Sequence, residues 1–359
     1  MTAPSASAPA PEGGERRTWP VLVLLSLAVL VGVVLSVFVG SVTVPVGDTA
    51  AVVLGDRSNP FASVVIDFRV PRTVTALVVG AALGLAGMQM QTLFRNPLAD
   101  PYILGASSGA SLGVALVVLL GGTSAGAFTS GLTAMGRNGM VIAAAAGAGL
   151  VLGIIAVLSR WVRSSVSLLL VGVMLASVST AAVSVLLTMT RPQLAQQFLE
   201  WGMGTFRAST YQDLWLMVPL VFVGVLIAAL TIRPLNALLL GEGYARSMGI
   251  RIGPTRIRII VSAAILAGVT TAFCGPIGFL GLVVPHLARF AVGSSDHRKV
   301  MPATVLVGAL LALICGVIAE LPGTGRVLPL GAITALFGAP MVIVVLIRAS
   351  RGRLSGVGI

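Results

Sequence analysis

Residues 69–111 read RVPRTVTALVVGAALGLAGMQMQTLFRNPLADPYILGASSGAS. Two apolar stretches in this segment flank QTLFRNPLADP at residues 91–101, where an arginine, an asparagine, an aspartate and two prolines occur together. Pro97 cannot continue a helix and disfavours a helical Asn96, whereas Pro101 suits the first turn of a helix. The segment therefore predicts a long apolar helix, a polar turn and a second apolar helix.

The composition of the whole chain predicts that such helices cross a membrane. Of the 359 residues, 57% are hydrophobic and 9% are charged, whereas a soluble domain carries about a quarter charged residues. A helix needs about 20 apolar residues to cross the hydrocarbon core, and the apolar runs are near that length. Barrel strands would be about half as long and would alternate polar with apolar residues. We therefore expect an all-α polytopic membrane protein.

Apolar runs separated by charged residues, proline or glycine predict ten spans. Residues 1–18 are small, polar and proline-rich and are expected to form a disordered cytoplasmic tail before the transmembrane domain of residues 19–359. The ten spans lie near residues 19–41, 73–94, 102–121, 139–159, 166–189, 213–232, 258–274, 277–295, 301–321 and 328–347.

The basic residues predict which side of the membrane each loop faces. Ten spans would place both termini on one side. Seven of the 23 lysines and arginines fall on the opposite side and 16 on the side of the termini, which is therefore predicted to face the cytoplasm. This asymmetry accounts for the net charge of +12, so no nucleic-acid partner is expected. The seven are Arg57, Arg69, Arg72, Arg137, Arg191, Arg207 and Arg326.

No pattern in the chain predicts catalysis, a cofactor or a metal site. There is no G-x-x-x-x-G-K-[ST] loop, so any ATP hydrolysis is expected from another chain. Cys274 and Cys315 stand alone in apolar spans and are expected to pack as small hydrophobic residues. His286 and His297 fall near the cytoplasmic end of the eighth span, where a structural or interface role is favoured over a haem ligand.

Two further features concern packing and docking. Glycines at small-xxx-small spacing, as in Gly80–Gly84 and Gly105–Gly109, predict close approach of helix backbones. Residues 233–257, the longest cytoplasmic loop, are too short and too charged to span the membrane. Their apolar residues are compatible with a helix on the bilayer surface or with docking into a groove on a partner.

The sequence also resembles a known family. Residues 69–111, LLLGEGYARSMGI at 238–250, GPIGFLGLVVPHLAR at 275–289 and LPLGAITALFGAP from residue 328 match, in order, the blocks of FecCD-type permeases. These are the membrane subunits of bacterial ABC importers for ferric siderophores, haem and cobalamin. The resemblance implies the BtuC-like type II fold, with ten helices and both termini cytoplasmic.

The resemblance also implies the partners. A second copy of the permease, two ATP-binding subunits that hold ATP and magnesium, and a substrate-binding protein or lipoprotein are expected around a chain in the bacterial inner membrane. The expected cargo is an iron chelate, a ferric siderophore or haem, with cobalamin as the alternative. An ion-coupled secondary transporter is the alternative class, disfavoured because the spans lack a convincing carboxylate.

Three groups of site residues follow from the resemblance. Arg69 and Arg72 are expected to dock a binding protein from an exposed helix face, against the alternative of snorkelling; a third family arginine aligns with Glu320. Ser164 and Ser165 are expected to form a cytoplasmic gate, although they also suit a helix N-cap. The residues expected to contact the ATPase, where Ala245→Arg should block docking without unfolding the subunit, are Gly241, Glu242, Ala245, Arg246, Ser247 and Gly249.

Overall fold

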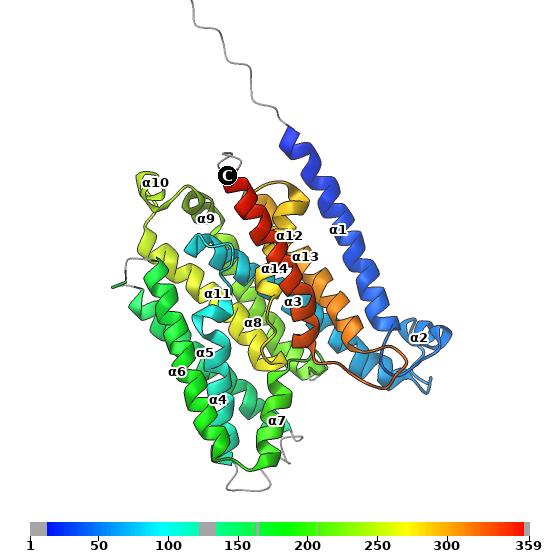
Figure 1. The fold of residues 1–359 in the computed structure, drawn as a ribbon. Coiled ribbons are helices and arrows are strands. Elements are labelled where there is room, and N and C mark those ends of the chain that lie inside the picture. Colours follow the sequence, from blue (N-terminus) through cyan, green and yellow to red (C-terminus); the bar gives the residue numbers. More distant parts are fainter. Residues whose placement is uncertain (1–12, 122–133, 160, 163–164, 208, 355–359) are drawn as a thin grey trace, which may run out of the picture.

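The structure is a computed structural model that describes residues 13–121, 134–159, 161–162, 165–207 and 209–354, and within these it is a bundle of helices joined by turns (Figure 1). The expected all-α fold is confirmed. The longer helices are α1 (Gly13–Phe38), α3 (Val70–Phe94), α4 (Ala106–Gly121), α5 (Ala134–Leu158), α6 (Ser165–Thr188), α8 (Tyr211–Leu230), α11 (Ile252–Cys274), α12 (Leu280–Val292), α13 (His297–Ala319) and α14 (Leu330–Leu354). Short helical elements between them are α2 (Val46–Val53), η1 (Val64–Arg69), η2 (Pro101–Leu104), α7 (Pro192–Gly202), α9 (Ile232–Leu239) and α10 (Glu242–Ser247).

Seven of the described helices are long and apolar enough to cross a membrane. They correspond to the first, second, fourth, fifth, sixth, seventh and ninth predicted spans, although their ends differ from the predicted ones. The other three predicted spans correspond to the shorter apolar helices Ala106–Val117, Leu280–Val292 and Leu330–Val344, so the count of ten stays a prediction. At the N-terminus, α1 begins at Gly13 and takes in residues 13–18, which the sequence assigned to the tail; residues 1–12 lie outside the described part.

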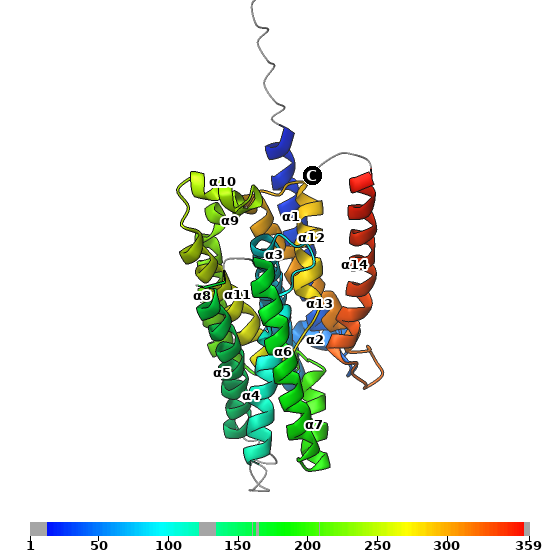
Figure 2. The ribbon, with the colours of Figure 1, turned by 60° about the vertical axis from the view of Figure 1, so that its left-hand side comes forward.

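Helix α3 occupies the centre of the bundle. It packs against α8, α11, α12 and α13, and most of its side chains are buried. Figures 1 and 2 show α4, α5, α6 and α7 grouped together, while α1 and α14 lie at the periphery. Lipid tails would cover the outer face of α1, because its exposed side chains are mostly apolar.

Glycines allow α3 to approach its neighbours closely. A Cβ built on Gly80 would overlap the carbonyl oxygen of Gly308 in α13, and one built on Gly84 would lie 2.7 Å from a methyl group of Val284 in α12. A Cβ on Gly109 would likewise lie 2.5 Å from the carbonyl oxygen of Gly147 in α5. The close backbone packing expected from the glycine spacing is therefore confirmed at these crossings.

The polar turn at residues 91–101 forms as predicted, between the end of α3 and the start of η2, and part of it is buried. Arg95 ends α3 with φ of 48°, in the left-handed region, and the side chain of Asn96 accepts a hydrogen bond from the Leu98 amide at 2.9 Å. Asp100 accepts one from the Tyr102 amide at 2.8 Å, which caps η2, and is itself buried. The clustered polar residues therefore satisfy the backbone where two helices end and begin.

The two ends of the molecule differ in what they carry. The start of α1, the pair α9 and α10, and the end of α14 lie together at one end in Figure 1, which we call the α10 end. Helices α2 and α7 lie toward the opposite end, the α2 end. The start of α1 and the end of α14 therefore lie at the same end of the described bundle as α9 and α10, as expected if residues 233–257 and the two ends of the chain share one side of the membrane.

Candidate functional site

Two glycines bound the short helix at the α10 end. Gly241 has φ of 109° and Gly249 has φ of 80°, conformations that other residues rarely adopt. Between them lies α10, and the Ile250 amide donates to the carbonyl oxygen of Ala245 at 3.0 Å, which closes the helix end. The six residues predicted to contact an ATPase therefore fall within one helix and its two flanking turns, which we call the α10 segment (residues 241–249).

Large apolar side chains are exposed along this segment. Leu240, Tyr244 and Met248 are exposed, and the exposed side chains of Arg246 and Ser247 lie among them in the sequence. We call these five residues the α10 surface. Exposed apolar residues interspersed with charged and polar ones are typical of a site where another protein binds.

One predicted contact residue does not belong to that surface. Ala245 is 0% exposed and packs in the hydrophobic core, so it supports α10 from beneath. The effect of Ala245→Arg stays a prediction, but the variant is not a clean test of docking, because an arginine there also has to displace core side chains. Gly243 is exposed, and a Cβ added to it meets no atom within 4 Å.

The predicted cytoplasmic gate falls where the structure says little. Ser164 lies outside the described residues. Ser165 begins α6, and its side chain also lies outside the described part. The gate therefore stays a prediction.

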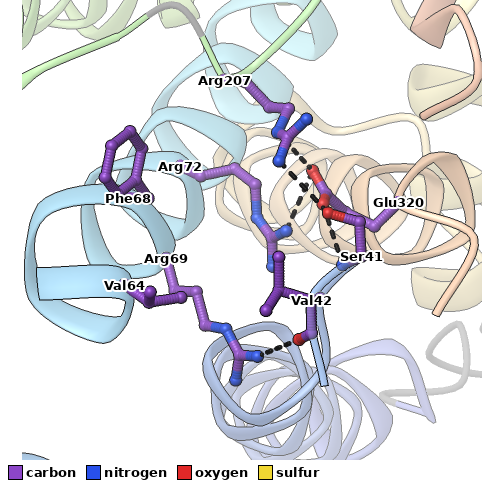
Figure 3. Close-up of a pocket in the computed structure, with 9 residues that line it drawn as sticks. Ser41, Val42, Val64, Phe68, Arg69, Arg72, Arg207 and Glu320 are labelled. Atoms are coloured by element: carbon purple, nitrogen blue, oxygen red, sulfur yellow. Dashed lines mark hydrogen bonds and ion pairs between the residues drawn. The ribbon is translucent and has the colours of Figure 1, made fainter. Parts of the chain in front are cut away.

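At the α2 end, Arg69 points toward the C-terminal end of α1 (Figure 3). Its guanidinium group donates hydrogen bonds to the carbonyl oxygens of Val37 at 3.0 Å, Phe38 at 2.9 Å and Val42 at 2.8 Å. The last carbonyl groups of a helix lack partners within the helix. Arg69 therefore caps α1 and the chain that follows it.

Arg72 combines the same capping role with an ion pair. It donates to the carbonyl oxygens of Ser36 and Val39, and its Nη1 lies 3.0 Å from Oε1 of Glu320. The expectation that Arg69 and Arg72 project from the surface is wrong, because the two residues are 3% and 5% exposed. Their role in docking a binding protein stays a prediction.

Arg207 extends this network to the surface. Its Nε lies 3.4 Å from Oε1 of Glu320, its Nη2 donates to Oγ of Ser41 at 3.2 Å, and its side chain is 47% exposed. The sequence placed Arg207 on the sparsely basic side of the membrane but did not select it for docking. The only sequence signal for a role of Arg207 was that it is one of the seven arginines predicted on that side.

These side chains line a cavity of about 230 Å³ (Figure 3). Among the lining residues, three guanidinium groups face one carboxylate, so the wall carries a net positive charge and suits an acidic group. The lining is Gly40, Ser41, Val42, Val64, Phe68, Arg69, Arg72, Arg207 and Glu320.

The histidines are engaged by the protein. Nε2 of the fully buried His297 lies 2.9 Å from Oγ1 of Thr92, and its Nδ1 lies 2.7 Å from Oδ1 of Asn236. Nδ1 of His286 lies 2.8 Å from the carbonyl oxygen of Leu282, one turn earlier in α12. These contacts support the structural role that the sequence favoured over a haem ligand.

Comparisons with known proteins agree on one class of molecule. A model of the FecCD transport family matches residues 28–348. The vitamin B12 import system permease proteins BtuC of Salmonella paratyphi A and Salmonella typhi are 37% and 36% identical to this chain over 337 residues, which cover 94% of it and 98% of each relative. A solved structure of a metal-chelate type ABC transporter in an inward-facing conformation has a TM-score of 0.78, with 28% identity over 92% of this chain and 99% of that one.

Proposed function

The chain belongs to the FecCD transport family of ABC importer permeases, and we propose that its substrate is an iron chelate, either a ferric siderophore or haem. The similarity to a solved metal-chelate transporter supports this substrate class. Cobalamin is the second candidate, because the relatives at 36–37% identity are named as vitamin B12 permeases. We place the protein in the inner membrane of a bacterium.

In the proposed mechanism, two copies of the chain move the substrate across the membrane. The permease itself makes and breaks no covalent bond. A binding protein or lipoprotein delivers the chelate to the α2 end, the chelate enters a pathway between the two copies, and two ATPase subunits dock at the α10 end. ATP binding and hydrolysis on those subunits alternately close and open the ends of the pathway. The observation that supports this most directly is the α10 surface, whose apolar side chains are exposed on and beside a helix too short to cross a membrane.

The substrate is tested in a complex reconstituted in lipid vesicles. ATPase activity and uptake are measured with the binding protein loaded in turn with haem, a ferric siderophore and cobalamin. Stimulation by one of the two iron chelates supports the proposal. Stimulation by cobalamin alone overturns the iron chelate in favour of the second candidate, and uptake driven by an ion gradient without ATP overturns the importer mechanism.

Charge placed on the α10 surface should prevent ATPase capture. In Tyr244→Asp with Met248→Asp, two apolar contacts become carboxylates, and truncating interface anchors costs about 2 kcal/mol or more each, so capture should fall at least about tenfold. Co-purification of the ATPase with the detergent-solubilised permease measures this. Leu54→Asp, at a still more exposed apolar residue near the α2 end, is the control and should capture normally. Normal capture by the double variant would refute docking at this surface.

Removing the exposed guanidinium at the α2 end should weaken capture of the binding protein. In Arg207→Gln, the affinity for the loaded binding protein should fall about three- to tenfold at low salt and less at 0.5 M salt, because screening already weakens contacts between exposed charges. Biolayer interferometry across a salt series measures the change. Arg258→Gln removes an exposed arginine from α11 and should have no effect. A salt-independent change would show that Arg207 acts through the fold and not through its charge.

A further inference from the structure

Helix α10 is connected to the bundle through two neighbours. It packs chiefly against α9 and α11, so any displacement of α10 has to reach the bundle through those helices or through individual side chains. On the α11 side, Oε1 of Glu242 lies 2.8 Å from Nη2 of Arg256. Glu242 also pairs with Arg246 at 3.2 Å, but that arginine is 65% exposed and free to move in solvent, whereas Arg256 is 5% exposed.

Arg256 makes a further contact with a third element. Its Nη1 donates to the carbonyl oxygen of Val162 at 2.9 Å, and Val162 lies in the turn between α5 and α6. One guanidinium group on α11 therefore holds a carboxylate of α10 on one side and the backbone of the α5–α6 turn on the other. The guanidinium is planar and rigid, so its two donors cannot change their spacing to follow independent movements of the two acceptors.

Close packing accounts for only part of the connection between α10 and Val162. A cavity of about 500 Å³ opens beside them, lined by Ser159, Glu242, Arg246, Ile250, Arg251, Ile252, Gly253 and Arg256. Ala245 of α10 and Val162 both pack against the hydrophobic core, and the bonds of Arg256 add a direct polar connection between the two elements across the side that is open. Arg256 is 5% exposed, so loss of Glu242 would leave a buried guanidinium group without its carboxylate partner, which is costly.

We propose that Arg256 is a positioning residue that transmits movement of α10 to the α5–α6 turn, and thereby couples the ATPase subunits to the transport pathway. The inference rests on the proposed function. Arg256 lies on α11 and is not one of the residues of the α10 surface. Its side chain is buried, so a partner docked on that surface would not touch it. Loss of Arg256 should therefore leave ATPase binding and ATP hydrolysis intact, but less substrate should be transported for each ATP hydrolysed.

The test compares Arg256→Met with Arg258→Met in the reconstituted complex. Both variants remove one arginine from α11, but Arg258 is exposed and serves as the matched control. With Arg256→Met, ATPase capture should match the wild type, and substrate transported per ATP hydrolysed should fall at least about fivefold, the lower end of typical coupling between distant sites. Arg258→Met should keep the wild-type ratio.

Folding and the proposed function are checked separately. The thermal midpoint and the size-exclusion profile show whether Arg256→Met folds. If it does not, Arg256→Gln is used, which keeps a polar amide but cannot form an ion pair with Glu242. A folded variant of either kind with the wild-type ratio of transport to hydrolysis overturns the proposal. A wild-type permease that captures no ATPase overturns the proposed function instead, before any variant is compared.

The two halves of the link can be tested by a double-mutant cycle. If Glu242 and Arg256 act as one connection, the ratio of transport to hydrolysis in Glu242→Gln with Arg256→Met should be no lower than in Arg256→Met alone. Multiplied losses in the double variant would show that the two residues act independently, and would overturn the link.

Discussion

Replacing Gly80 by valine should prevent the chain from folding. Gly80 lies where α3, the central helix, crosses α13. A Cβ at this position would overlap the carbonyl oxygen of Gly308 and lie 2.6 Å from Cβ of Ala312. Those are backbone and short side-chain atoms, which cannot rotate aside. The two helices would have to separate, and the loss should exceed the ~1–3 kcal/mol typical of overpacking in a core.

The measurement is the thermal midpoint in detergent, together with the yield of monodisperse protein. Gly149→Val is the matched control, because Gly149 also lies within a helix, α5, and a Cβ added to it meets nothing within 4 Å. We expect the control to purify like the wild type and Gly80→Val to be lost to aggregation. A Gly80→Val protein with an unchanged midpoint would mean that α3 and α13 do not pack as closely as the structure shows.

The membrane helices could be predicted well because hydropathy reports directly on burial in lipid. The ends of α11 show the limit of that signal. The predicted span begins at residue 258 and leaves Arg256 in the preceding cytoplasmic loop, because charged residues mark the ends of apolar runs. In the structure α11 begins at Ile252 and takes in Arg256, because that charge is paired with Glu242 and bonded to Val162. A pairing of this kind across a loop leaves no local trace in the sequence.

For the site residues as well, the sequence predicts features that depend on neighbouring residues and misses those that depend on contacts with distant residues. The spacing of Arg69 and Arg72 correctly indicated neighbouring arginines where a helix begins. Their burial depends on Glu320, which lies far away in the sequence and which the family comparison marked only as a reversal of charge. Likewise, the motif located the α10 segment, but only the fold separates the buried Ala245 from the exposed Tyr244.

Replacing Glu320 by leucine should destabilise the subunit strongly. Glu320 is 3% exposed, and it neutralises Arg72, accepts from the Ser41 amide at 3.2 Å and contacts Arg207. Without it, Arg72 would stay buried with its charge uncompensated, a situation that costs about 3–5 kcal/mol. Because Arg72 also caps α1, the strain should reach the contact between α1 and α3.

Removing both charges should recover much of that loss. In Arg72→Met with Glu320→Leu, no buried charge remains unpaired, and apolar replacements of buried ion pairs are often neutral or stabilising. We therefore expect the thermal midpoint in detergent to fall sharply in Glu320→Leu and to return most of the way in the double variant. Glu200→Leu, which removes an exposed carboxylate from α7, is the control and should change little. If the double variant were less stable than Glu320→Leu alone, the capping bonds from Arg72 to Ser36 and Val39 would outweigh its charge, and Glu320 would not be its essential partner.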